Sequence, residues 1–291
     1  MTMASTTTQR EPATTSHQPV RIGRRTGAAL AAASFFGLVA FLWPLIGAAN
    51  STAITHASET PWLFSVLLPL VIAVVLADMS DGGLDAKGIA LIGVLSAVAA
   101  ALRPFGGGHA GFEPMWIVII LGARVLGPGA GFGIGAIGMF ASALLTGGVG
   151  PWLAFQMIAA GWVGLGAGLL PKASGRREIV LLATYGAISS IAYGFLLNLW
   201  FWPTVTVTGT LPAAISFIPG AGFVTNVQHW MAFCVTTSLG FDIPRALLTV
   251  VLIVVAGRPI LNALRRASRR AAFDVPVTFA TSSVSSSASM R

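Results

Sequence analysis

Hydrophobic residues are grouped along the chain into eight runs, separated by short segments rich in glycine, proline or charged residues. About 20 apolar residues in a helix are enough to cross the ~30 Å hydrocarbon core of a bilayer. The pattern therefore predicts an all-α polytopic membrane protein with eight spans. We expect these spans at 28–47, 62–77, 88–102, 114–125, 129–145, 152–170, 179–201 and 244–261.

The composition agrees with a membrane protein and excludes an ordinary soluble domain. Hydrophobic residues make up 55% of the 291 and charged residues only 9%, whereas charged residues supply roughly a quarter of a typical soluble domain. The formal net charge of +8 does not indicate nucleic-acid binding, because the basic residues lie in tails and short loops between apolar runs. The single cysteine, Cys234, excludes an intrachain disulfide.

The basic residues are distributed unequally between the two ends of the predicted spans. With the N-terminus inside the cell, Arg103, and Arg245 beside Asp242, are the basic residues on the outer side. By the positive-inside rule, both termini are predicted to be cytoplasmic. The cytoplasmic segments and their flanks hold Lys87, Arg124, Lys172, Arg176, Arg177, Arg258, Arg265, Arg266, Arg269 and Arg270.

The same pattern divides the chain into four parts. Residues 1–27 are polar and predict a disordered cytoplasmic tail, and 28–80 predict a transmembrane hairpin. Residues 86–264 form a predicted core, followed by a basic and then serine-rich cytoplasmic tail at 265–291. A cleaved signal peptide is an alternative for the first run, because small residues follow it. The long polar lead and the full length of the run favour a retained helix.

Polar and aromatic residues are concentrated on the predicted outer side. The segment 202–242 contains no Lys or Arg and predicts a long external loop that is too polar in places to span. Aromatic faces with a few amides and charges suit a heteroaromatic ligand, whereas the alternative is an interfacial belt of tryptophans with solvated loops. The candidate ligand-binding residues are Arg103, His109, Glu113, Trp152, Gln156, Asn198, Trp200, Trp202, Asn226, Gln228, His229 and Trp230.

Small residues recur at helical spacing in the run 88–102, at Gly93, Ala97 and Ala101. Small residues on one face let two membrane helices approach closely, because packing drives helix association in lipid. The spacing alone leaves two interpretations open, which are contact with another helix of the same chain and contact with a partner protein.

The sequence contains no established catalytic signature. It has no Walker A, HExxH or Gly-x-Ser-x-Gly motif, and no pair of carboxylates is expected within the spans. His109 and Glu113 are four residues apart, but the glycine between them and Pro114 after them disfavour a helical metal pair. We therefore predict a protein without enzymatic activity, cofactor or metal site, whose energy coupling comes from other subunits.

Four stretches of the predicted core carry a resemblance to a known family. They are IALIGVLSAVAAALRP, GFEPMW, RVLGPGAGFGIGAIG and GGVGPWLAFQM, in this order. From about residue 86 to 264 the chain resembles the substrate-binding S component of an energy-coupling factor (ECF) transporter, the vitamin-uptake branch of the ABC transporters. The two additional N-terminal spans depart from the six-helix plan of that family.

The resemblance implies a multi-pass protein of a bacterial cell membrane that captures a vitamin from outside, with cobalamin or a precursor ranked first. Riboflavin and thiamine precursors remain alternatives. It also implies docking on a transmembrane coupling (T) subunit through Gly93, Ala97 and Ala101, with two cytoplasmic ATPases driving the cycle. Competing hypotheses are a self-contained secondary transporter, a membrane-embedded enzyme using His109, Glu113 or His229, and a structural scaffold.

Overall fold

The computed structural model describes residues 23–46, 86–106 and 111–271, together with 69–70, 72–74, 76–77 and 80. The described residues contain α-, 3₁₀- and π-helices joined by turns, and no β-strand. The α-helices are α1 (Arg24–Ile46), α3 (Ala86–Leu102), α4 (Met115–Leu126), α5 (Pro128–Thr146), α6 (Leu153–Leu169), α7 (Gly175–Val207), α8 (Phe223–Phe233) and α9 (Leu239–Ala271).

Five of the described helical segments are long and apolar enough to cross a membrane, and α4 and α6 are shorter apolar helices. The prediction of an all-α polytopic membrane protein is confirmed. Seven of the eight predicted spans correspond to helices, which are α1, α3, α4, α5, α6, α7 and α9. Helix α8 was not predicted as a span, and it forms one continuous segment with α9, Phe223–Ser268. The remaining predicted span, at 62–77, lies mostly outside the described residues, as do most of the two predicted tails.

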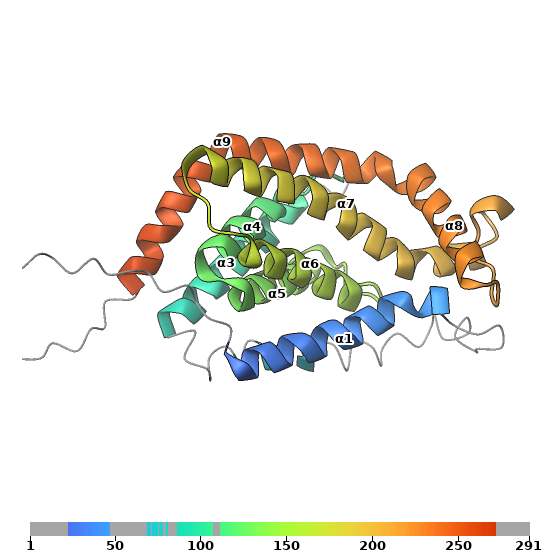
Figure 1. The fold of residues 1–291 in the computed structure, drawn as a ribbon, viewed down its shortest axis with the longest axis horizontal. Helices are drawn as coiled ribbons and strands as arrows, with labels where there is room; N and C mark the ends of the chain where they lie inside the picture. The colour runs from blue at the N-terminus through green and yellow to red at the C-terminus, as the bar shows by residue number, and fades with distance from the viewer. Residues whose placement is uncertain are drawn as a thin grey trace, which may run out of the picture.

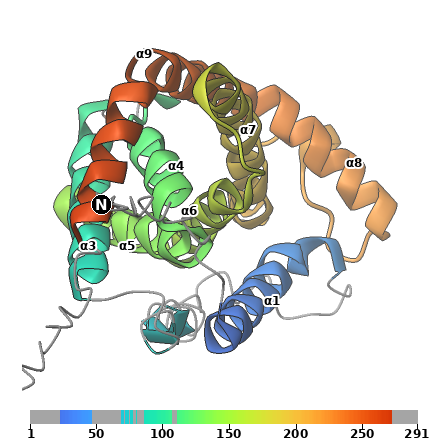
Figure 2. The same cartoon turned by 60° about the vertical axis from the view of Figure 1, so that its left-hand side comes forward.

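The helices are arranged around α5, which packs against α3, α4 and α6. The long helices α7 and α9 lie side by side along one flank of this group, and α9 also contacts α4 (Figure 1). Helix α1 lies on the other flank and contacts α6, α7 and α8 (Figure 2). The six-helix core therefore consists of α3 to α7 and the α8–α9 segment, with α1 added outside it.

Glycines allow α5 and α6 to pack with their backbones in contact. A Cβ atom added to Gly135 would lie 2.2 Å from the carbonyl oxygen of Ala160, and one added to Gly164 would lie 2.0 Å from that of Gly131. Gly127 has a φ of 96° in the tight turn that joins α4 to α5, a conformation that glycine adopts without strain. Close backbone approach is a common means of packing helices in lipid.

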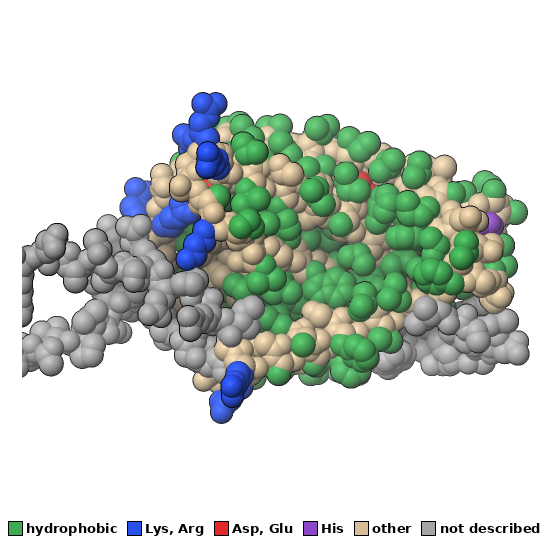
Figure 3. All heavy atoms as spheres, viewed as in Figure 1, with side chains coloured by type: hydrophobic (Ala, Val, Ile, Leu, Met, Phe, Trp, Pro, Cys, Tyr) green, Lys and Arg blue, Asp and Glu red, His purple; other side chains and the backbone are tan. Residues whose placement is uncertain are grey.

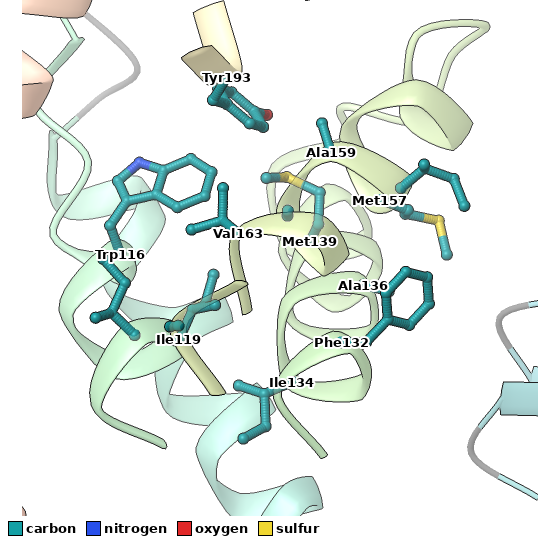
Figure 4. Packing of buried hydrophobic residues seen from close by; sticks show 14 of the residues in the cluster. Trp116, Ile119, Phe132, Ile134, Ala136, Met139, Met157, Ala159, Val163 and Tyr193 are labelled. Atoms are coloured by element: carbon teal, nitrogen blue, oxygen red, sulfur yellow. The ribbon is translucent and has the colours of Figure 1, made fainter. Parts of the chain in front are cut away.

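The interior is filled by large apolar side chains from several helices (Figure 4). Trp116 of α4, Phe132 and Met139 of α5 and Ile158 of α6 are almost completely buried. Large apolar side chains are also exposed on the outer surface, including Val255, which is 74% exposed. Apolar residues cover much of the visible side of the molecule (Figure 3). Lys and Arg gather at the end where α9 ends and α1 begins, which we call the basic end. Such a surface suits a hydrocarbon environment.

The predicted external loop at 202–242 is wrong in its bounds. Helix α7 continues to Val207, and helical structure resumes at Phe223, so that only 208–222 connects the two segments. The polar residues that suggested a loop are accommodated within helices: the hydroxyls of Thr204, Thr206 and Thr237 each donate to the carbonyl oxygen four residues earlier. A threonine satisfied in this way does not need water.

The final helical segment is longer than any single crossing requires. Phe223–Ser268 comprises 46 residues, which would extend about 69 Å if straight. It contains a π-helix at Cys234–Ser238 and two internal prolines, Pro244 and Pro259, which are common causes of bending. Figure 1 shows the C-terminal part of α9 turned away from α7. The basic run at 265–270, predicted as a tail, continues this helix.

Candidate ligand-binding site

Four charged side chains meet at the end of the core opposite the basic end. Arg245 Nε lies 2.9 Å from Glu113 Oε2, and Arg245 Nη1 lies 2.7 Å from Asp242 Oδ1. Arg103 Nε lies 3.8 Å from Glu113 Oε1. The four side chains are between 2% and 18% exposed. We call Arg103, Glu113, Asp242 and Arg245 the charge cluster, and its formal charges sum to zero.

The charge cluster joins elements that are distant in sequence. Arg103 begins the 3₁₀ turn Arg103–Gly106 that follows α3, and Glu113 lies two residues before α4. Asp242 and Arg245 are one turn apart in the first part of α9. The cluster thus holds both ends of the loop between α3 and α4 against α9.

The aromatic side chains of Trp116 and Tyr193 contact the charge cluster. The indole N–H of Trp116 donates to Glu113 Oε2 at 3.1 Å. The ring of Trp116 packs edge-to-face on Tyr193, with centroids 4.5 Å apart, and the guanidinium of Arg245 lies 5.2 Å from the centre of the Tyr193 ring. Because Glu113 and Arg245 each have several partners, their positions are fixed by the fold.

Asp242 is packed tightly against α7. A Cβ atom added to Gly194 would lie 1.9 Å from Asp242 Oδ1, so no larger residue fits there beside this carboxylate. The second oxygen, Asp242 Oδ2, is buried and has no hydrogen-bond partner among the described residues.

Arg103 connects the charge cluster to two further helices of the core, α5 and α6. Its Nη1 donates to Ser142 Oγ at 2.9 Å, and its Nη2 lies 3.5 Å from Gln156 Oε1. A guanidinium carries five N–H donors, and only the bond to Ser142 is short. Arg103, at 18% exposed, is also the most accessible member of the cluster. It therefore retains donors that could bind an anionic group or a carbonyl oxygen.

Two predicted tryptophans lie together near Gln156. The rings of Trp152 and Trp200 are 6.2 Å apart, and Phe155, adjacent to Gln156 on α6, lies 5.9 Å from Trp200. Trp152 is 39% exposed and its indole N–H donates to the carbonyl of Gly148. These aromatic faces and the donors of Arg103 belong to the same end of the core, which is the arrangement expected of a site for a ring-containing polar ligand.

Three other predicted residues are engaged with the connection at 208–222. The side-chain amide of Asn226 bonds both the N–H and the carbonyl of Ile218. Trp202 Nε1 donates to the Ile215 carbonyl at 2.7 Å, and His229 Nδ1 lies 2.9 Å from the Ser216 carbonyl. These polar groups hold the connection in place, so they are less available to a ligand.

The remaining predicted residues have varied surroundings. Asn198 is buried and donates to Cys234 and Ser238, and Gln228 is exposed. Trp230 packs against Phe195, and its indole N–H is buried with no hydrogen-bond partner in the part of the chain that the structure describes. His109 lies outside the described residues.

Comparison with known proteins assigns the family. A model of the family "ECF transporter, substrate-specific component" matches residues 87–257, which is more than half of the chain. The chain belongs to this family. No curated protein and no solved structure matches it. The resemblance noted in the sequence is confirmed, and the match includes all four residues of the charge cluster.

Family membership sets the general role of the chain. It is a substrate-specific component of an ECF transporter, and it acts with the transmembrane and ATPase modules of such a transporter. The family is one of transporters and not of enzymes. The match begins at the start of α3 and ends within α9, so α1 lies outside it.

The structure changes the position of one acid in this ECF component. No pair of carboxylates was expected within the spans, and Glu113 does lie outside the helices, before α4. Asp242, predicted at the end of the external loop 202–242, lies instead inside the segment Phe223–Ser268 and shares Arg245 with Glu113. Each acid directly precedes an apolar run in the sequence, so each was assigned to the end of a span. The signal that could have revealed the pair is the opposite charge of Asp242 and Arg245 at helical spacing.

A second group of charges lies at the basic end. Glu178 Oε1 is 2.9 Å from Arg124 Nε and 2.6 Å from Arg265 Nη2, and Arg124 also donates to the carbonyl of Leu170. This group ties α4, α7 and α9 together. The described residues contain no group of three or more His, Cys, Asp or Glu side chains that could hold a metal ion.

The small residues of α3 are on its outer surface. Gly93, Ala97 and Ala101 are exposed, and a Cβ atom added to Gly93 would meet nothing within 4 Å. Instead, Ser96 and Ala99 face α5, where they approach Gly138. The interpretation that these three small residues pack inside the chain is therefore wrong.

Proposed function

We propose that this substrate-specific component captures a vitamin on the outer side of a bacterial cell membrane and delivers it through an ATP-driven T subunit. The basic end faces the cytoplasm in this proposal, as the positive-inside rule requires, and both termini are expected on that side. The charge cluster and Trp152 then lie toward the outer side, where the ligand enters.

The observation that carries the proposal is the meeting of Arg103, Glu113 and Gln156, three predicted ligand residues from three parts of the sequence. Arg103 supplies unused N–H donors, and Trp152 and Trp200 supply aromatic faces near it. A ligand with a heteroaromatic ring and carbonyl, carboxylate or phosphate oxygens fits this chemistry. We rank cobalamin or a precursor first, and riboflavin and thiamine precursors belong in the same panel.

We infer that the chain itself catalyses no reaction. Glu113 and Asp242 both bind Arg245, whereas a general acid or base needs a carboxyl group that is free to meet its substrate. His229, one of the candidate catalytic residues, bonds the backbone of the connection at 208–222. ATP-driven rather than self-contained transport follows from the family, and transport that persists without an ATPase partner would contradict it.

Ligand identification tests the proposal directly. The full chain is purified in mild detergent, and small molecules that accompany it are identified by absorbance and mass spectrometry after denaturation. We expect a vitamin at close to one molecule per chain, or a clear rise in melting temperature with one vitamin of the panel. An empty protein that no vitamin stabilises would refute the proposed capture of a vitamin.

Replacing Arg103 with glutamine is expected to weaken vitamin binding by about 10- to 100-fold, because hydrogen bonds from a charged donor contribute about 1.5–3 kcal/mol. Glu113 keeps Arg245 in this variant, so the fold is expected to persist. Titration of the purified variant measures the change. Lys172→Gln, an exposed change at the opposite end, is the control and should bind normally. Unaltered affinity of the Arg103 variant would place the ligand elsewhere.

Replacing both Ala97 and Ala101 with leucine is expected to abolish co-purification of the T subunit. Each leucine adds bulk to an exposed position of α3 and would hold a facing helix away. Vitamin binding by the isolated chain should not change. Val255→Leu, at an exposed position of α9, is the matched control. An intact complex in the double variant would show that α3 is not the docking surface.

A further inference from the structure

A groove runs between α7 and α9, and its charged end lies at the basic end of the molecule. It encloses about 850 Å³ and is lined mainly by apolar side chains, with an arginine from each helix at one end. We call it the α7–α9 groove. The residues that define it are Arg176, Ala183, Ala187 and Ile188 of α7 and Val250 and Arg258 of α9.

The groove exists because small residues lie between larger ones. Ala183 and Ala187, one turn apart on α7, form part of its lining, while Val180 and Ile188 beside them are 64% and 62% exposed. On the other side, Val254 of α9 is 56% exposed. The surface is therefore hollowed between two exposed apolar rims, and apolar material can lie against it.

The two arginines of the groove have no acidic partner among the described residues. The described part of the chain contains three acidic side chains, and all are bound elsewhere: Glu113 and Asp242 in the charge cluster, and Glu178 by Arg124 and Arg265. Arg176 and Arg258 are exposed at the same end of the groove. Two positive charges without an acidic partner in the described ranges, beside an apolar surface, favour an occupant that is anionic at one end and apolar along the rest.

The length of the groove agrees with one leaflet of a bilayer. Arg176 and Ile188 are twelve residues apart on α7, which corresponds to about 18 Å along a helix. Half of a ~30 Å hydrocarbon core is about 15 Å. Helix α9 is antiparallel to α7, so Arg258 lies at the same end of the groove as Arg176, and Val250 lies toward Ile188. A small soluble anion would leave most of this length unfilled.

We propose that the α7–α9 groove is a binding site for an anionic phospholipid of the cytoplasmic leaflet. The lipid phosphate lies between Arg176 and Arg258, and one acyl chain follows Ala183 and Ala187 toward Ile188. The site is separate from the proposed vitamin site and does not depend on which vitamin, if any, the protein binds.

The test compares retention of two lipids by the full chain. The protein is equilibrated with equal amounts of phosphatidylglycerol and phosphatidylcholine in detergent, and bound lipids are counted by native mass spectrometry. We expect the natural sequence to retain phosphatidylglycerol at least fivefold over phosphatidylcholine. Arg176→Gln with Arg258→Gln should reduce this ratio to near one. The matched control, Arg177→Gln with Arg266→Gln, removes the same charge from exposed arginines outside the groove and should keep the preference.

A second pair of changes tests the apolar part. Ala183→Phe with Ala187→Phe fills the groove but keeps both arginines, so retention of phosphatidylglycerol should fall as it does in the arginine pair. No lipid preference in the natural sequence, or equal loss in the control pair, would overturn the proposal. Retained lipid with loss of the T subunit in the arginine pair would instead identify the groove as a protein interface.

Discussion

Replacing Arg245 with methionine is expected to lower the free energy of unfolding by about 3–5 kcal/mol, because removing one partner of a buried ion pair leaves an uncompensated charge. Among the described residues, Arg245 is the only arginine that forms an ion pair with Asp242. Glu113 forms ion pairs with Arg245 and Arg103, and Arg245 is the closer of the two. Unfolding of the purified protein, followed by circular dichroism during titration with a denaturing detergent, measures the loss.

The ion pairs of Glu178 provide a control, because the charges there are arranged in the opposite way to those around Arg245. One acid is shared there by two arginines, so Arg265→Met leaves Glu178 paired with Arg124 and should cost much less. A double variant, Arg245→Met with Asp242→Asn, removes one charge of each sign and leaves Glu113 with Arg103, so it should recover most of the lost stability. Equal losses in the Arg245 and Arg265 variants would show that the charge cluster has no special role in the fold.

Replacing Gly135 with leucine is expected to prevent folding. A Cβ atom at this position would lie 2.2 Å from the backbone oxygen of Ala160, and a backbone atom cannot move aside as the end of a flexible side chain can. The helices α5 and α6 would have to separate along their whole contact, losing the packing that holds membrane helices together. Size-exclusion chromatography after mild extraction should show aggregate in place of a single symmetric peak.

Gly93→Leu is the matched control for Gly135→Leu, because it adds the same side chain to an apolar helix at a position where nothing lies within 4 Å. The control should fold normally. If Gly135→Leu also gave a single symmetric peak with normal thermal stability, the close contact between α5 and α6 would be wrong.

The helices were predictable from the sequence because membrane spans depend on local composition. Apolar runs and the placement of Arg124, Lys172 and Arg265 give the spans and the basic end without any tertiary information. The ends of α7 and of the last segment were not predictable by this means. Threonines such as Thr206 look polar in sequence, and only the helix itself supplies the carbonyl oxygen that satisfies the hydroxyl.

The candidate site was predictable in part. Arg103, Glu113 and Gln156 were selected because polar residues are rare between apolar runs, and the structure brings these three together. Their partner Arg245 was assigned to the mouth of a span from its place at the start of the last apolar run. Its contact with Glu113 was not predictable, because 132 residues separate the two. Trp202 and Asn226 were selected by the same criterion, but they bind the connection at 208–222. Composition identifies the end of the core at which polar residues gather, and the partners within that end depend on tertiary packing.

The position of α1 makes two sides of the protein, both facing the plane of the membrane, different from each other. Helix α1 packs on α6, α7 and α8, with Phe41 against Phe155, whereas Gly93 and Ala97 lie on α3, which packs on α4 and α5. The two helices lie on different sides of α5 and α6 (Figure 2). The additional N-terminal helix therefore widens the protein on a side remote from the proposed docking surface. A membrane protein that packed on α1 would not displace a T subunit docked on α3.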